Sequence, residues 1–167
     1  MRFPDSIRAH LTAALPELAR SAEALSIHVT GGTVAARMTE NLGYELRYTL
    51  NIVLLNCCYA PGQIFLPLLL WMRANQPELL LNHQDGVEKI RFAVDPVDNQ
   101  AVDIEIQLPL AEAVNVLPHP GGGYEMTVRE QPPMPGLEPL TDPLAILRQI
   151  WGKADGVEQF IVGYPDD

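Results

Sequence analysis

The sequence is short of positive charge and of long apolar runs. Eleven basic side chains stand against 21 acidic ones, so the formal net charge is −10. A surface of this kind repels phosphate backbones, which disfavours tight binding to nucleic acid. The longest apolar run, residues 64–72, is well below the roughly 20 residues that span a bilayer. The polar sequence after Met1 also predicts no signal peptide.

Cysteine is scarce, and its placement excludes a disulfide framework. Cys57 and Cys58 are adjacent, and neighbours on a strand point to opposite faces, which is a poor geometry for a bridge. We expect both to be reduced, small core residues of a protein made in a cytosol. A single domain of 167 residues can bury roughly 68–70% of the surface of its unfolded chain, so no metal or disulfide is needed for folding.

Motifs for catalysis and cofactor binding are missing. Asp103 and Glu105 project from one face of a predicted strand, but alternation predicts this for any solvated sheet face. There is no nucleophile elbow, P-loop or dinucleotide-binding glycine pattern. No two of the four histidines stand at the spacing of metal ligands: His10, His28, His83 and His119. We therefore expect no enzyme, no cofactor, no metal and no catalytic residue.

The N-terminal third predicts a helix followed by a hairpin. Residues 4–15 carry apolar side chains at helical spacing, and Pro16 should end the helix near Ala14 or Leu15. Residues 25–36 alternate apolar and polar positions around Gly31 and Gly32. Two glycines supply the positive φ angles of a two-residue turn, so this segment predicts a hairpin.

The strand predicted over residues 44–58 has one apolar row and, at its start, one polar row. From Val53 and Leu55 onward both rows are apolar, so the second face also needs a cover. The helix predicted around Leu66 to Met72 is apolar nearly all round, which is typical of an interior helix. We expect this helix to cover Val53 and Leu55, and Trp71 to be a core residue.

Further strands complete the predicted sheet. Residues 89–95 and 102–110 alternate cleanly and should pair antiparallel across a turn at Asp98, and residues 113–130 predict a third hairpin with its tip at Gly121 to Gly123. The fold class is therefore α+β, an antiparallel or mixed sheet with helices packed on one face, in one domain over residues 1–130.

The C-terminal part differs from the rest of the chain in composition. Residues 131–142 are rich in proline and predict an extended linker. Residues 143–167 predict a short helix over 143–151 and a tail. A helix this short is marginal in water unless it packs on something.

Several spaced blocks resemble one family. "PDSIRAHLTAALPEL", "YTLNIVLLN", "LPLLLWMRANQPELL" and "FAVDPVDNQAVDIEIQLPL" resemble, in this order over about residues 3–130, the tail completion protein R family of temperate bacteriophages with contractile tails. The block "LPLLLWMRANQP" is the most specific of them.

The resemblance implies a structural role in a virion. Proteins of this family act at the head-proximal end of a finished tail, which they help to cap and make competent to join a head. Similarity to tail terminators implies a terminator-like fold and a homo-oligomeric, hexameric ring. The implied partners are further copies, tail tube and sheath proteins and neck proteins, with no membrane and with DNA only passing through the lumen. A ring of acidic subunits suits such a passage.

The implied ring supplies a partner for the C-terminal segment. We expect it to dock on a neighbouring subunit through four apolar side chains: Leu144, Leu147, Ile150 and Trp151. Two alternatives to a tail cap stay open from the sequence. One is an adaptor ring of the neck, and the other is a soluble α+β domain that binds a ligand or catalyses a reaction. A full phage and a headless tail-like particle are equally compatible with the resemblance.

Overall fold

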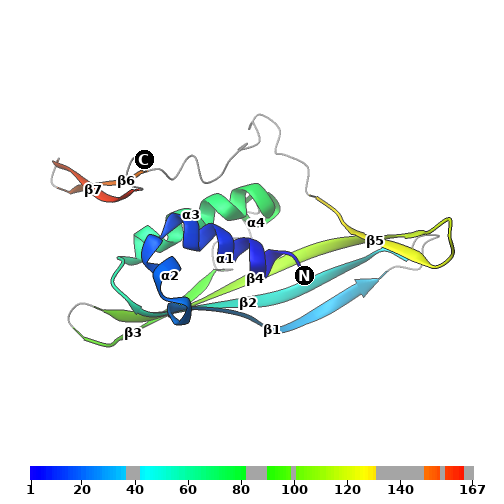
Figure 1. Ribbon diagram of the computed structural model, residues 1–167, viewed down its shortest axis with the longest axis horizontal. Coiled ribbons are helices and arrows are strands. Elements are labelled where there is room, and N and C mark those ends of the chain that lie inside the picture. The colour runs from blue at the N-terminus through cyan, green and yellow to red at the C-terminus, as the bar shows by residue number, and fades with distance from the viewer. Residues whose placement is uncertain (37–41, 82–89, 99–100, 131–148, 155–156, 164–167) are drawn as a thin grey trace.

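The computed structural model describes residues 1–36, 42–81, 90–98, 101–130, 149–154 and 157–163. In chain order its elements (Figure 1) are α1 (Phe3–Ala14), α2 (Pro16–Arg20), the 3-10 turn η1 (Ala22–Ala24), β1 (Leu25–Ala36), β2 (Tyr44–Cys57), α3 (Pro61–Asn75), α4 (Pro77–Leu81), β3 (Arg91–Pro96), β4 (Val102–Pro118), β5 (Tyr124–Val128), β6 (Gln149–Ala154) and β7 (Val157–Gly163).

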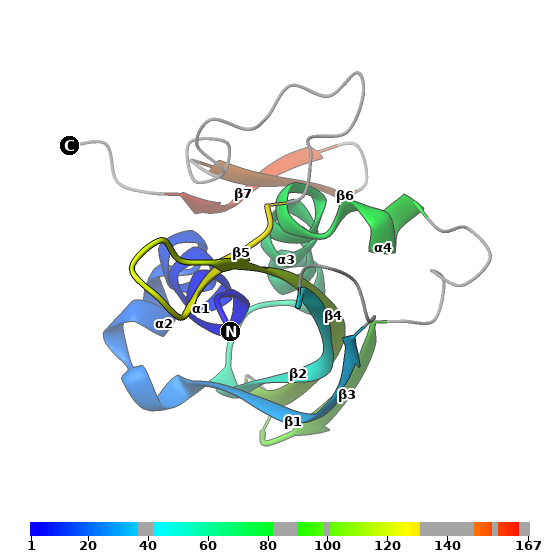
Figure 2. The same cartoon turned by 90° about the vertical axis from the view of Figure 1, so that its right-hand side faces the viewer.

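Five strands form one antiparallel sheet in the order β1-β2-β4-β3, and β5 pairs with β4 further along that strand. β2 and β4 are paired along most of their length, with Leu50 opposite Leu108 at the centre. Figure 2 shows α1, α2 and α3 on one side of the curved sheet. The predicted α+β fold class, with helices on one face of an antiparallel sheet, is confirmed.

The first helix begins and ends where the sequence predicts. Pro4 occupies its first turn, and Ile7 and Leu11 are fully buried on the face toward the sheet. α1 ends at Ala14 because Pro16 has no N–H to continue the hydrogen-bond ladder. Pro16 instead opens the short helix α2.

The second long helix packs against the first through Trp71, whose side chain is only 2% exposed. Its indole Nε1 donates a hydrogen bond to Ser6 Oγ at 2.9 Å. Its ring meets Phe3 edge to face at a centroid distance of 5.2 Å. The prediction that Trp71 belongs to the core is confirmed, and α1 and α3 form one helical layer.

That helical layer covers the face of β2 opposite to the one predicted. Tyr48, Leu50 and Leu54 are buried against the helices, whereas Val53 is half-buried and Leu55 is 40% exposed. The expectation that α3 covers Val53 and Leu55 is therefore wrong. A helix packs best on a continuous apolar row, and only the row of Leu50 is continuous along the whole strand.

The hairpin predicted around Gly31 and Gly32 is also wrong, because β1 is one continuous strand paired with β2. The register shifts between Val29 and Gly31, so a bulge stands where the turn was expected. Gly32 allows the two backbones to approach closely: a Cβ there would lie 2.6 Å from the carbonyl oxygen of Arg47. Gly32 therefore allows a close approach of the two backbones, and the glycine pair makes no turn.

The strand predicted over 102–110 and the first arm of the third hairpin are one long strand, β4. The hairpin tip is confirmed, since Gly122 and Gly123 adopt positive φ angles of 92° and 85°. On its outer edge β4 pairs with β3 as far as Gln107 and with β5 from Val114. Pro109 lies between these partners, where a missing N–H breaks no ladder bond.

Candidate assembly surfaces

The four residues predicted to form a subunit interface do not form one helix. Leu144 and Leu147 lie outside the described residues. Ile150 and Trp151 belong to strand β6, so the helix predicted over residues 143–151 is wrong for its last turn. β6 pairs antiparallel with β7, with Ile150 opposite Val162 and Trp151 opposite Phe160. β-branched and aromatic residues in both segments favour strands, a signal that the helical spacing obscured.

Among the outer strands of the main sheet, β1 and β3 differ in how they protect their free edges. β3 is short and carries Arg91, Asp95 and Pro96, which are typical guards against pairing with another chain. β1 is twice as long, and its residues 26–36 include no Asp, Glu, Lys, Arg or Pro. The outer edge of β1 is therefore unguarded by charge or proline, and only the bulge between Val29 and Gly31 interrupts it.

Large apolar side chains are exposed at both ends of the long sheet. At one end Phe92 of β3 is 55% exposed and stacks edge to face on Phe65 of α3, at 5.0 Å between ring centroids. At the other end the β4–β5 hairpin, which extends past the helical layer in Figure 1, exposes Leu117, Tyr124 and Met126. Exposed apolar side chains of this size mark candidate protein contacts.

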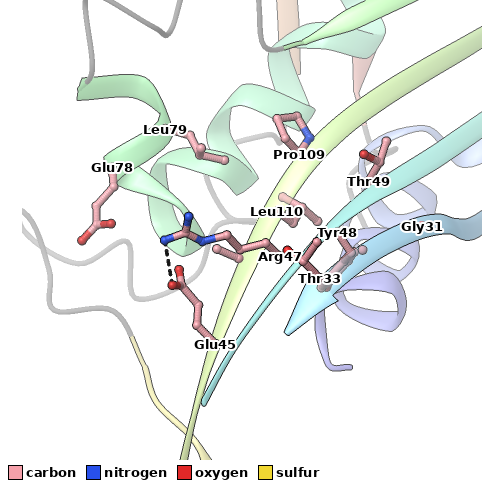
Figure 3. A pocket seen from close by; sticks show the side chains of 12 residues that line it. Gly31, Thr33, Glu45, Arg47, Tyr48, Thr49, Glu78, Leu79, Pro109 and Leu110 are labelled. Carbon is pink, nitrogen blue, oxygen red and sulfur yellow. Dashed lines mark hydrogen bonds and ion pairs between the residues drawn. The ribbon is translucent and has the colours of Figure 1, made fainter. Parts of the chain in front are cut away.

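A groove of about 670 Å³ crosses the face of the sheet opposite to α1 and α3, and α4 lies beside it (Figure 3). Thr49 and Pro109 line it, and Arg47 pairs with Glu45, two residues earlier on the same strand, at 2.9 Å. Its lining contains no histidine, cysteine or serine within the described residues. The groove thus offers a shallow, mixed polar surface, in which the Glu45 carboxylate is already paired with Arg47.

A small hydrogen-bond network lies further along the same open face. Glu105 Oε1 accepts hydrogen bonds from Asn51 Nδ2 at 2.8 Å and from Gln107 Nε2 at 3.3 Å. Asn51 is buried, and its Oδ1 has no hydrogen-bond partner within the described residues. Glu105, weighed above as half of an acidic pair, is therefore tied into the sheet, while Asp103 Oδ1 accepts a hydrogen bond from the backbone of Asn56.

The buried carboxylate of Glu112 has a structural role. It accepts hydrogen bonds from the Tyr48 hydroxyl and from the backbone N–H groups of Arg2, at 3.1 Å, and Phe3, at 3.5 Å. A carboxylate at a helix N-terminus satisfies free N–H groups and complements the helix dipole. Burial and the hydrogen bond to Glu112 raise the pKa of Tyr48, so its hydroxyl stays protonated.

The buried histidine and cysteine are likewise structural. His10 Nε2 donates a hydrogen bond to the carbonyl oxygen of Pro67 at 2.9 Å, and burial lowers the pKa of His10. Burial raises the pKa of Cys57, which makes its thiol a poor nucleophile. Both cysteines are free; Cys57 is in the core as expected, but Cys58 is exposed.

No cluster of three or more metal-ligating side chains exists in the described part of the chain. Among the described helices, none combines the length and apolar character required to cross a membrane. The described residues thus present sheet edges, exposed apolar ends and a shallow groove, all of which suit contacts between proteins.

Comparison with known proteins agrees with this character. Residues 1–132 match the family described as P2 phage tail completion protein R (GpR). The chain is 31% identical over 146 residues to "Tail completion protein R" of Escherichia phage P2, an alignment that covers 87% of this chain and 92% of the relative. No solved structure matches the chain. The chain therefore belongs to the P2 phage tail completion protein R family, and is a structural protein of a phage tail and not an enzyme.

Proposed function

We propose that this chain caps the head-proximal end of a contractile tail, as a hexameric ring, and makes that tail competent to join a head. The observation that carries the proposal is the family match over residues 1–132, which spans the whole helix-and-sheet body. The relative in phage P2 bears the name of a tail completion protein. A cap acts through its contacts with other proteins, and the surfaces of this chain offer such contacts.

The sheet has the asymmetry that a ring subunit requires. A ring forms when one surface of each subunit meets a different surface of the next and the rotation closes. The edge of β1, which lacks charge and proline, and the opposite side of the sheet, where the β4–β5 hairpin is exposed, are two such unlike surfaces. Their placement at opposite edges supports head-to-tail contacts between copies.

The partners of this ring are the tail tube and sheath below it and the neck proteins above it. Its lumen passes the genome, and the net charge of −10 opposes adsorption of the DNA phosphates during passage. On the open face of the sheet Asp95, Asp103 and Glu105 stand close in register on β3 and β4. These carboxylates are the described candidates for a lumen surface.

Deleting the gene from an inducible prophage that carries it tests this function. We expect the lysate to contain heads and sheathed tails that stay separate in negative-stain micrographs. Adding the purified chain to that lysate should restore joined particles, because the cap is the only component withheld.

A matched control is a chain with Gly62→Ala in the first turn of α3, a position at which a new Cβ meets nothing within 4 Å; it should restore joining as well as the natural chain. Joined particles at an undiminished yield in the deletion lysate would contradict the proposal. Tails without baseplates would also contradict it, since they would place the chain at the other end.

A further inference from the structure

The outer edge of β1 is built as an acceptor for another strand. β1 runs from Leu25 to Ala36, and only its inner edge is paired, with β2. Soluble proteins block long edges with charges, prolines or very short strands, because a free edge templates pairing with another chain. Residues 26–36 carry no charge of Asp, Glu, Lys or Arg and no proline, and residues 31–36 are all exposed. The bulge between Val29 and Gly31 is the one such device on this edge, and an edge of this length with so little protection is expected to be covered in the working protein.

The C-terminal hairpin is a strand pair without a host sheet. β6 and β7 pair with each other as a separate sheet of two strands and make no extensive contact with another described element. A two-stranded hairpin is at best marginally stable in water, whereas three or more strands with an apolar face hold together. The hairpin thus needs an additional strand, and β1 needs a cover.

The geometry of the chain links this donor and this acceptor. The body ends at β5, which lies on the side of β4 away from β1, and residues 129–148 separate β5 from β6. Fully extended, a segment of that length reaches about 70 Å, more than the width of a domain of this size. In the single chain the hairpin does not pair with its own β1. The chain leaves the body on the β5 side of the sheet, and the free acceptor edge of β1 is on the other side. This arrangement joins copies head to tail.

We propose that the β6–β7 hairpin of one copy adds to the outer edge of β1 in the next copy. One strand of the hairpin would pair with β1 through backbone hydrogen bonds and so extend the main sheet across the subunit boundary. This inference rests on the proposed ring, for which it names the contact. Each copy then donates one hairpin and accepts another.

The test compares four forms of the chain by light scattering after size-exclusion chromatography and by hydrogen exchange. These are the natural chain, a chain ending at residue 148, a Thr33→Lys/Val34→Lys variant of β1, and an Ala93→Lys variant of β3. The two β1 lysines place charge on both faces of the acceptor edge. Ala93 is equally exposed, but it lies on the edge that is already guarded.

We expect the natural chain and the Ala93→Lys variant to form the same oligomer. The other two forms should be monomers that unfold cooperatively in urea, with midpoints that do not depend on protein concentration. Amides of β1 should exchange roughly tenfold faster in the truncated chain than in the natural chain, since strand pairing protects them. Combining the truncation with the β1 lysines should have no further effect, because both remove the same contact.

Three results would overturn the inference. They are a natural chain that is monomeric at every concentration, a truncated chain that assembles like the natural one, and equal exchange of β1 in both. The last two would leave the tail cap itself standing, with another contact holding the ring. Conversely, the chain could assemble through β1 while the deletion lysate still joined heads to tails. That result would contradict the cap and leave the hairpin contact standing.

Discussion

The side-chain amide of Gln76 takes the place of a neighbouring strand for Ala111. Gln76 Oε1 accepts the Ala111 N–H at 3.1 Å, and Gln76 Nε2 donates to the Ala111 carbonyl at 2.9 Å. Ala111 lies in the stretch of β4 that is paired with neither β3 nor β5. The buried amide, 1% exposed at the end of α3, therefore fixes the helical layer to the sheet where backbone partners are missing.

Replacing Gln76 by Leu should destabilise the protein by about 2–4 kcal/mol, because two backbone groups of Ala111 would be buried without partners. The free energy of unfolding from urea denaturation measures this loss. Glu78→Gln, a change in the adjacent helix α4, is the control and should stay within about 0.5 kcal/mol of the natural chain. An equal effect of both substitutions would show that the amide does not fix α3 to β4.

Tyr48 and Glu112 hold the start of α1 on the sheet. Tyr48→Phe should lower the free energy of unfolding by about 1.5–3 kcal/mol, the range for a buried hydrogen bond to a charged group. Tyr44→Phe on the same strand is the control and should cost little. Because its pKa is raised, Tyr48 should also resist ionisation above pH 10 until the protein unfolds, as seen by absorbance at 295 nm. Ionisation of Tyr48 in the folded protein near pH 10 would contradict this arrangement.

His10 makes stability depend on pH in one direction. Burial lowers the pKa of His10 below its ordinary value of 6.5, so the unfolded chain binds this proton more readily than the folded one. The stabilisation is complete above pH 6.5 and should be lost as the pH falls below it. A His10→Gln variant keeps a donor for the Pro67 carbonyl without titrating, and its urea midpoint should vary less between pH 7.5 and pH 5. An unchanged slope in His10→Gln, matching that of a His28→Gln control on the exposed face, would disprove this role.

Adjacent glycines of β1 should respond oppositely to alanine. In Gly32→Ala the new Cβ meets the backbone of Arg47 and Tyr48, and the forced separation of β1 from β2 should cost about 1–3 kcal/mol. Gly31→Ala adds a Cβ in open space and should stay within about 0.5 kcal/mol of the natural chain. Thermal unfolding of both variants decides the matter, and equal midpoints would contradict the close approach.

Much of the body follows from local sequence signals. Pro4 and Pro16 bound α1, the period-two rows mark β2 and β4, and Gly122 and Gly123 mark the β4–β5 tip. These elements could be predicted because their signals act within a few residues. The family could be predicted as well, because several spaced blocks carry it along the chain.

The rest depends on contacts between distant segments. The glycine pair in β1 looks like a turn until the close backbone of β2 is known, and Pro109 argues against a central strand until the break in its outer partners is seen. Apolar residues around Ile150 fit both a helix and a strand by spacing. The unguarded edge of β1 could be read from its missing charges only once that strand was known to be outermost.

The most direct test of the proposed function is an electron cryomicroscopy map of the intact particle. We expect density for this chain as a six-fold ring at the head-proximal end of the tail, between the last tube and sheath subunits and the neck. Density for the chain in the baseplate, or none in the finished tail, would contradict it.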